Sequence, residues 1–419
     1  MGCLPDSPLR CSSGSGKSNR EKGVVVRGLV VSNVMPHLRR TGGEVCTHSF
    51  LDAITALGHD LDLVAYSRLG DTSVLPRNFH SATARHVESD LAGFQAYAWL
   101  ARAYISGNSY GATKYRSGPM LRTVRQLVTR NHYDFSIIDH TQLGWLLEAM
   151  VLPQPIILIA HNVELALYAD LATETGRSGT IKRAVLAREA KLLLQLEQKL
   201  LRECRQVWVL TPSDQNALAT IAPQARGHIR QFDVPGPPPP SGIAPFEPDI
   251  DVGILGSWLW DANRSGLEWF MREIVPLLPT SYRVHIAGKG AENVPNPYQN
   301  VTYDGFVDNA IAFLRRSKVV VVPTVAGAGV QIKTIEGISS GVPMVSTAIG
   351  LRGISEIPDF VTMGETAADM AKAIREKVST TAPRSFAAGA HWDMSRRARF
   401  KSAIAASLLE LGISGTSVS

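Results

Sequence analysis

Apolar runs rich in β-branched residues recur along the chain, and each is bounded by turn residues and followed by a stretch with helical spacing. Short strands that alternate with longer helices predict parallel sheets wrapped by helices. The first five predicted strands are 24–31, 61–66, 135–139, 156–160 and 207–210. The continuous apolar character of 156–160 is typical of a strand covered on both faces.

The alternation stops between residues 233 and 249, where Pro235 and the prolines at 237–240 dominate. Proline removes a backbone donor and fixes φ, so this segment is predicted to be an extended linker. Strands are predicted again at 252–255, 282–287, 301–303, 319–322 and 344–346. We therefore expect Rossmann-like α/β domains at 22–232 and 250–394, joined by a Pro-rich linker at 233–249. Residues 395–419 are expected to form a helix that returns to the first domain, followed by a tail.

Composition narrows the class of protein. A chain of 419 residues is long enough for two cores, and its 45% hydrophobic and 19% charged residues are those of a globular protein. Residues 1–21 are rich in Ser, Gly and charge, which predicts a disordered tail and no secretory signal. No apolar run approaches the roughly 18 residues that a membrane-spanning helix needs. Four cysteines without paired or metal-like spacing favour the reducing cytoplasm.

The net charge of +6 favours an anionic partner, which the charge alone does not identify. Nucleotide phosphate, a phospholipid headgroup and nucleic acid all carry the required charge. Nucleic acid is not expected, because the sequence has no basic patch interleaved with aromatic residues.

The segment 319–353 is the most informative part of the sequence. A buried strand ends at Pro323, a loop with Gly327 and Gly329 follows, and a helix is predicted to begin near Val330. Backbone amides and the positive end of the helix dipole would then meet at one point, where an anion is stabilised.

Lys333 and Glu336 are three residues apart and therefore share a face of the first turn of this helix. A cation there suits a phosphate, and a carboxylate suits the hydroxyls of a ribose. The alternative is an ordinary ion pair on the surface of a helix.

The spacing of Lys333, Glu336-Gly337, Gly341, Pro343, Val345, Thr347 and Gly350 resembles the donor-binding motif of retaining GT-B glycosyltransferases of family 4. This resemblance implies two Rossmann-like domains whose parallel sheets face an interdomain cleft. It also implies transfer of a sugar from a nucleoside diphosphate sugar, with retention of configuration. In the family, the lysine contacts the donor phosphate and the glutamate binds the ribose, so these roles are assigned to Lys333 and Glu336.

Further donor-side residues follow from the same resemblance, in the order of the family's loops. They are Gly43, Gly256, Ser257, Arg264, Gly305, Phe306, Gly329 and Val330. The family usually has a second glutamate, which contacts the transferred sugar, where this chain has Ala328. This departure motivates an alternative, namely a GT-B protein that binds nucleotide or glycan without transferring sugar.

Polar residues at the predicted strand ends of the first domain mark the acceptor side of the cleft, because parallel α/β sheets bind ligands at that edge. His161 follows strand 156–160 and matches a histidine that the family places beside the transferred sugar, so we expect it to be catalytic together with Lys333 and Glu336. The other acceptor-side candidates are Gly42, Glu44, Asp139, His140, Asn162 and Glu164. A helix-capping role is the alternative for Glu164, and a simple turn is the alternative for the Gly42-Gly43 pair.

Asp60-x-Asp62 and Asp249-x-Asp251 imitate the metal-binding motif of another glycosyltransferase fold. Because both pairs precede a predicted strand instead of following one, we interpret them as solvated turns. We expect no metal and no other cofactor.

Basic residues cluster on two amphipathic stretches, 114–130 and 181–205. One interpretation is an apolar stripe facing the core with a solvated basic face. The other is docking on an anionic membrane leaflet to reach a lipid-linked acceptor. The expected partners are thus a nucleotide sugar, a glycan, lipid-linked or small-molecule acceptor, and a peripheral contact with the inner face of the membrane from the cytoplasm.

Overall fold

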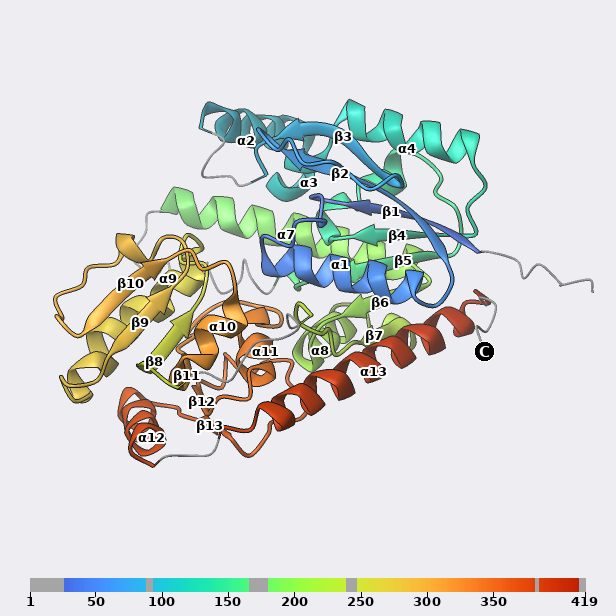
Figure 1. Cartoon of the computed structure of the whole chain (residues 1–419). Coiled ribbons are helices and arrows are strands. Elements are labelled where there is room, and N and C mark those ends of the chain that lie inside the picture. Colours follow the sequence, from blue (N-terminus) through green and yellow to red (C-terminus); the bar gives the residue numbers. More distant parts are fainter. Residues whose placement is uncertain (1–25, 88–92, 166–179, 239–246, 381–383, 414–419) are drawn as a thin grey trace, which may run out of the picture.

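The computed structural model describes residues 26–87, 93–165, 180–238, 247–380 and 384–413. These residues form two parallel sheets, each covered by helices on both faces, one from each half of the chain (Figure 1). The GT-B architecture expected from the sequence is therefore confirmed at the level of its two α/β domains. The expected tail at 1–21, the middle of the Pro-rich linker and residues 414–419 lie outside the described residues.

The N-terminal sheet has the strand order β3-β2-β1-β4-β5-β6-β7, and all neighbouring strands are parallel. Its strands are β1 (Arg27–Ser32), β2 (Asp60–Arg68), β3 (Phe79–Arg85), β4 (Phe135–Asp139), β5 (Ile156–Ala160), β6 (Gln206–Val209) and β7 (Ile229–Gln231). The central strands β4 and β5 are buried at every position, as a strand covered on both faces must be.

The C-terminal sheet has the order β10-β9-β8-β11-β12-β13 and is also parallel throughout. Its strands are β8 (Ile250–Leu255), β9 (Val284–Ala287), β10 (Val301–Gly305), β11 (Ser317–Val322), β12 (Met344–Ser346) and β13 (Val361–Met363). Separate apolar clusters fill the two faces of each sheet.

Helices connect most successive strands in both domains, whereas loops join β2 to β3 and β12 to β13. In the N-terminal domain they are α1 (Gly42–Thr55), α2 (Phe94–Ser106), α3 (Tyr110–Tyr115), α4 (Gly118–Arg130), the short η1 (Thr141–Leu143), α5 (Leu146–Ala149), α7 (Thr180–Glu203) and α8 (Pro212–Ile221). In the C-terminal domain they are α9 (Asp261–Trp269), α10 (Ala310–Arg315), α11 (Ile332–Ser339) and α12 (Ala367–Ser379). Among the described residues, no helix is long and apolar enough to cross a membrane.

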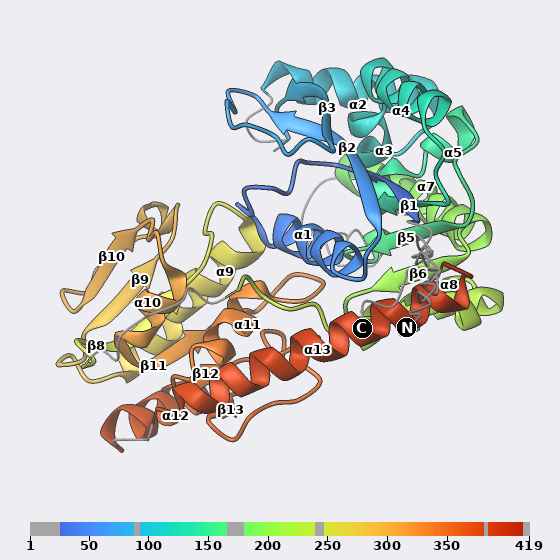
Figure 2. The ribbon, with the colours of Figure 1, turned by 45° about the vertical axis from the view of Figure 1, so that its right-hand side comes forward.

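The last helix, α13 (Phe386–Glu410), runs along both domains (Figures 1 and 2). Its first half crosses the end of α11, where a side chain on Gly389 would lie 2.5 Å from the backbone nitrogen of Gly341. Its second half packs on the N-terminal domain, with the ring of Phe400 centred 5.0 Å from that of Phe50. The helix therefore fastens the two domains to each other.

Arg396 of α13 is fully buried at this junction. Its guanidinium donates to the carbonyl of Val234, in the linker, at 2.9 Å and to that of Gly353 at 3.0 Å. The neighbouring Arg397 donates to the carbonyls of Gly236 at 2.8 Å and Pro237 at 2.9 Å, so α13 holds the first residues of the linker through backbone carbonyls that a proline can still offer.

The interpretation of the Asp-x-Asp pairs as solvated turns is wrong for the second aspartate of each pair, whereas Asp249 does precede its strand and Asp60 is exposed at the start of β2. Asp62 lies within β2 and pairs with Arg27 at 2.6 Å, while Asp251 lies within β8 and pairs with Lys318 at 2.8 Å. Both carboxylates therefore bind cations of neighbouring strands instead of lying in solvated turns.

Candidate active site

Three polar side chains meet where β4 and β5 end. Asp139 is the last residue of β4, His140 follows it, and His161 follows β5. The carboxylate of Asp139 accepts hydrogen bonds from Ser32 Oγ at 2.5 Å and Thr47 Oγ1 at 2.7 Å, and it lies 2.7 Å from His161 Nε2. Asp139 is completely buried, so it anchors the other groups and is not placed to touch an acceptor.

His140 adopts a backbone conformation that residues with a side chain rarely enter, with φ at 86° and ψ at 134°. The imidazole rings of His140 and His161 stack, with centroids 3.9 Å apart and planes 13° from parallel. Strained backbone of this kind persists only where the surroundings enforce it, and it is concentrated at functional sites.

Burial opposes ionisation of Asp139, but the two imidazoles outweigh it and hold the pKa of this carboxyl well below its usual range. Burial, reinforced by His140, lowers the pKa of His161. Burial also acts on His140, yet the carboxylate of Asp139 prevails and raises its pKa. His161 is thus the more readily neutral of the two rings, and its Nε2 proton points at Asp139.

The start of α1 borders this group. The added Cβ of an alanine at Gly43 would lie 3.9 Å from His140 Nε2, and one at Gly42 would lie 3.3 Å from the side chain of Ile332 in α11. Glu44 is fully buried and caps the helix, because its carboxylate accepts from the backbone amide of Arg40 at 2.8 Å and pairs with Arg68. These contacts favour a structural role for Glu44 over contact with an acceptor.

Asn162 and Glu164 follow His161 and differ in their surroundings. The amide of Glu164 donates to the carboxylate of Glu197 in α7 at 2.7 Å, and burial raises the pKa of Glu197 to about 8. Burial also raises the pKa of Glu164 itself. Glu197 was not predicted from the sequence, because one glutamate in a basic helix carries no signal.

On the C-terminal domain, Lys333 and Glu336 lie in the first turns of α11, half-buried. Lys333 Nζ donates to Asn263 Oδ1 at 2.9 Å and lies 5.8 Å from the centre of the Trp258 ring. The hydrogen-bond partner of Lys333 is therefore the side-chain amide of Asn263 in α9 and not Glu336. This weakens the alternative of an ordinary surface ion pair. Asn263 is a contact that the sequence analysis did not single out.

Burial lowers the pKa of Lys333 to about 8 and raises that of Glu336 to about 7. Burial thus shifts the pKa values of both groups toward neutral pH, and among the described residues no oppositely charged neighbour opposes either shift. Such perturbed pairs are concentrated at ligand sites, where a bound ion restores the charge balance.

The glycine-rich loop before α11 brings the domains together. Gly329 has φ at 69°, and an added Cβ would lie 2.5 Å from Asn162 Oδ1 and 2.8 Å from the backbone oxygen of His161. Only glycine fits this approach. The donor side around Lys333 and the histidines of the N-terminal domain are therefore adjacent across the cleft.

The loop is held from both sides. Arg352 donates to the carbonyl of Gly327 at 2.7 Å, a contact that the sequence analysis missed. Val330 is half-buried and packs against the apolar clusters of both domains. Ala328 is half-exposed and occupies the position at which the family has its second glutamate.

The ends of β8, β9 and β10 form the remaining edge of the donor side. The backbone amide of Gly288 donates to Gly305, and an added Cβ on Gly288 would lie 1.6 Å from the carbonyl oxygen of Gly256. Asn263 Nδ2 donates to the carbonyl of Ser257 at 2.9 Å. Phe306 is exposed here, with Lys289 Nζ 5.1 Å from the centre of its ring.

Arg264 and the two tryptophans of this region lie differently. Arg264 pairs with Asp261 at 2.5 Å and with Glu268 at 3.7 Å, so it must release its carboxylates to reach a phosphate. Trp258 is buried and donates to the carbonyl of Ala287 at 3.0 Å, whereas Trp260 is exposed. Trp258 is therefore a packing residue.

The possible ligand atoms of Asp139, His140 and His161 lie within 4.8 Å of one another, which is close enough to hold a metal ion. However, His161 Nε2 and His140 Nδ1 both face the carboxylate of Asp139, at 2.7 and 3.2 Å. Asp139 already accepts from two hydroxyls besides the imidazole. The geometry therefore favours a hydrogen-bonded network.

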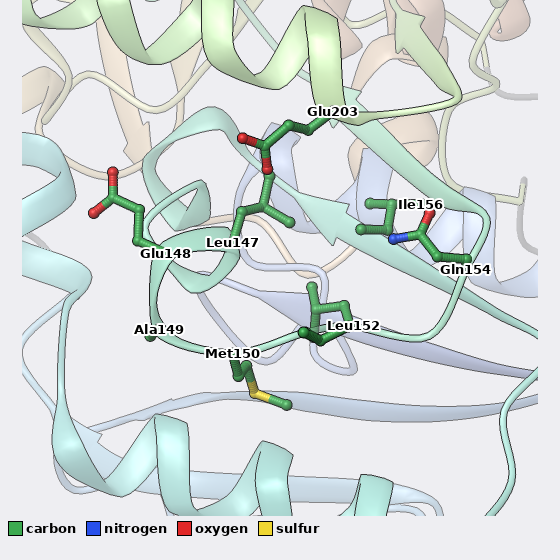
Figure 3. Close-up of a pocket in the computed structure, with 9 residues that line it drawn as sticks. Leu147, Glu148, Ala149, Met150, Leu152, Gln154, Ile156 and Glu203 are labelled. Atoms are coloured by element: carbon green, nitrogen blue, oxygen red, sulfur yellow. The ribbon is translucent and has the colours of Figure 1, made fainter.

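A cavity of about 430 Å³ lies elsewhere in the N-terminal domain (Figure 3). Glu148, Met150, Gln154 and Glu203 are among its lining residues, together with Ile156, the first residue of β5. It therefore opens at the amino end of β5, whereas ligands of parallel sheets bind at the carboxyl ends. This cavity does not belong to the candidate site.

Comparison with known proteins agrees with this geometry. Residues 249–379 match the family model of glycosyl transferases group 1. No curated protein matches the chain in sequence.

Solved structures of similar fold span nearly the whole chain. Sucrose-phosphate synthase from Thermosynechococcus elongatus has a TM-score of 0.58 at 15% identity, covering 92% of this chain and 97% of its own. HepE from Anabaena, solved with UDP and glucose, has a TM-score of 0.59 at 12% identity, covering 92% and 100%. A UDP-forming trehalose-phosphate synthase from Burkholderia xenovorans gives 0.57 at 13% identity, covering 93% and 100%. The chain therefore has the GT-B fold, and its C-terminal domain matches glycosyl transferases group 1 over residues 249–379.

Proposed function

We propose that the chain transfers a sugar from a nucleoside diphosphate sugar, which binds between Lys333 of the C-terminal domain and His161 of the N-terminal domain. The observation that carries this proposal is the contact of Gly329 with His161 and Asn162. It brings the start of α11 next to the histidine pair, so that one ligand can reach both. The lysine-to-glutamate segment of α11 also favours assignment to family 4 within the group.

The donor's diphosphate is assigned to Lys333 and to the backbone amides at the start of α11, where the helix dipole adds positive potential. Glu336 is assigned to the ribose hydroxyls, and the Gly305-Phe306 turn to the base. Because HepE was solved with UDP-glucose, UDP-sugars are the first donors to test. Positive charge beside the leaving diphosphate stabilises the negative charge that develops on it. This lowers the barrier to sugar transfer without requiring a metal.

His161 is assigned to the transferred sugar, and reaction with retention of anomeric configuration follows from the assignment to family 4. His140 and Asn162 border the acceptor side. The acceptor is a glycan, a lipid-linked sugar or a small molecule. A lipid-linked acceptor would bring the protein to the inner face of a membrane, from the cytoplasm.

Ala328 supports one competing function, a GT-B protein that binds nucleotide or glycan without transferring sugar. A thermal-shift screen with UDP-, GDP- and ADP-sugars separates the possibilities, followed by product analysis with the donor that binds. A ligand at about a hundred times its dissociation constant raises stability by about 2.7 kcal/mol. Binding with release of nucleotide and unchanged rates after EDTA treatment supports the metal-free transferase. Binding without turnover over any acceptor supports the silent protein, and no binding of any nucleotide sugar would exclude both.

A further inference from the structure

Helix α2 exposes an apolar face that the described residues cover only at Tyr104, where the guanidinium of Arg188 lies 4.2 Å from the ring centre. Only Trp99 and Ala103 of this helix are buried against the domain. On the opposite face, four large side chains are exposed to 86%, 72%, 45% and 88%, namely Phe94, Tyr97, Tyr104 and Ile105. Their spacing places them on one side of the helix. Large apolar side chains gathered in this way mark an interaction surface.

Helix α2 lies at the outer edge of the N-terminal domain, away from α13 (Figures 1 and 2). It is held there by cations around Trp99, since Arg85 lies 4.8 Å and Lys114 5.7 Å from the centre of its ring. The helix thus turns its apolar face outward while its single buried tryptophan fixes its orientation.

From the start of α2 to the end of α4 the chain carries only positive charge, whereas Glu88 and Asp90 precede this segment in the sequence. Residues 93–130 contain six basic residues and no aspartate or glutamate: Arg102, Lys114, Arg116, Arg122, Arg125 and Arg130. This segment alone therefore carries as much net charge as the whole chain, which is +6. A positively charged segment that includes an exposed apolar helix face is complementary to an anionic lipid leaflet.

A cavity of about 240 Å³ lies at the end of α2 and offers a place for a headgroup phosphate. It is lined by Arg102, Ser106, Asn108, Thr113 and Arg116. The guanidinium of Arg116 is held near Trp145, 5.7 Å from the ring centre, and 3.5 Å from Glu148. Among the described residues, Arg102 has no ion-pair partner, and the buried hydroxyl of Thr113 has no hydrogen-bond partner. Two guanidinium groups suit the geometry of a phosphate.

We propose that α2 docks the protein on an anionic phospholipid surface, with Phe94, Tyr97 and Ile105 entering the headgroup region and Arg102 and Arg116 binding lipid phosphate. This inference deepens the proposed function, because a lipid surface would present a lipid-linked acceptor. It differs from the docking helices suggested by the sequence. Leu121, Leu127 and Val128 of α4 pack against the core, so α4 contributes charge and no apolar contact.

The test is co-sedimentation of the full chain with vesicles. We expect binding to phosphatidylcholine vesicles that contain phosphatidylglycerol, weak binding to pure phosphatidylcholine, and partial release by salt. The variant Phe94→Ser/Tyr97→Ser/Ile105→Ser should bind at least tenfold more weakly, because three apolar side chains no longer enter the lipid. The variant Arg102→Gln/Arg116→Gln should lose about fivefold for each charge removed. Val151→Ser/Leu409→Ser removes side chains that are exposed to 85% and 66% on other elements and should bind like wild type.

Vesicle binding that is indifferent to phosphatidylglycerol, or equal in the α2 and control variants, would overturn the proposal. So would a dimer in solution that dissociates in the α2 variant, since a second copy would then cover the helix. Binding of duplex nucleic acid that is lost in the Arg102 variant would also count against it. Thermal shift with the nucleotide sugar on the same samples separates the two proposals. Donor binding without vesicle binding refutes only the docking surface. Vesicle binding without donor binding refutes only the donor site.

Discussion

The contact at Gly329 allows the domain junction to be tested with one methyl group. An alanine Cβ at this position would lie 2.8 Å from the backbone oxygen of His161, whereas ordinary contacts begin near 3.4 Å. The loop must therefore retreat by about 0.6 Å, because that oxygen belongs to the backbone and cannot rotate away as the side chain of Asn162 can. A left-handed alanine adds strain of about 1–2 kcal/mol.

We expect Gly329→Ala to lower kcat by about tenfold or more, since displacement of reacting groups by about 1 Å costs about a hundredfold. The donor should bind more weakly by a smaller factor than kcat falls, because the loop amides shift while Lys333 and Glu336 keep their places. Gly412→Ala is the matched control, since Gly412 has φ at 75° and nothing within 4 Å of an added Cβ. The Gly412→Ala variant therefore introduces the strain of a left-handed alanine without a steric clash.

The assay is steady-state turnover together with calorimetric donor binding for wild type and both variants, with unfolding followed by circular dichroism. Turnover of Gly329→Ala at the wild-type rate would refute the reasoning, because the domains would then not need this contact during catalysis. An equal loss in Gly412→Ala would attribute the effect to stability alone.

Three further predictions concern the groups around this contact. Arg396→Met should lower the free energy of unfolding by about 2–5 kcal/mol, because the carbonyls of Val234 and Gly353 lose a buried donor. Chemical denaturation checks this prediction, with Arg272→Met at the exposed surface as the control. Donor affinity should fall as the pH rises above about 8, where Lys333 loses its charge, and it should also fall as the pH drops below about 7, where Glu336 becomes protonated. Calorimetry across pH 6–9 checks this prediction, and a donor affinity that does not change with pH contradicts it. Asp139→Asn should lower kcat at least tenfold with folding retained, because Asp139 orients His161; kcat with circular dichroism checks this, and unchanged turnover makes the network purely structural.

The sequence predicted the fold best where burial is complete. Strands β4 and β5 were predicted with their observed bounds, because a strand covered on both faces is an uninterrupted apolar run. Strand β3 was missed, since it lies at a sheet edge, is at most half-buried and mixes polar with apolar residues. The short strands β7 and β13 were missed for the same reason, as both lie at sheet edges.

The site was predictable where one local segment carries the chemistry, as Lys333 and Glu336 do. Asn263 and Arg352 were missed because their contacts, to Lys333 and to Gly327, join loops that are distant in sequence. Asp139 was expected on the acceptor side, and only the structure reveals that it is buried beneath the histidines. A lone apolar helix such as α2 reads as core, because exposure cannot be deduced from its composition.

The central claim is that one ligand is held by Lys333 from one domain and acted on by His161 from the other. The most direct test measures kcat and the donor dissociation constant side by side for Lys333→Ala and His161→Ala. We predict that Lys333→Ala weakens donor binding and lowers turnover. His161→Ala should keep donor affinity but lose about 2–4 kcal/mol of transition-state stabilisation, or about 30- to 1000-fold in kcat. If His161→Ala turns over at the wild-type rate, or Lys333→Ala binds the donor unchanged, the two-domain site described above is contradicted.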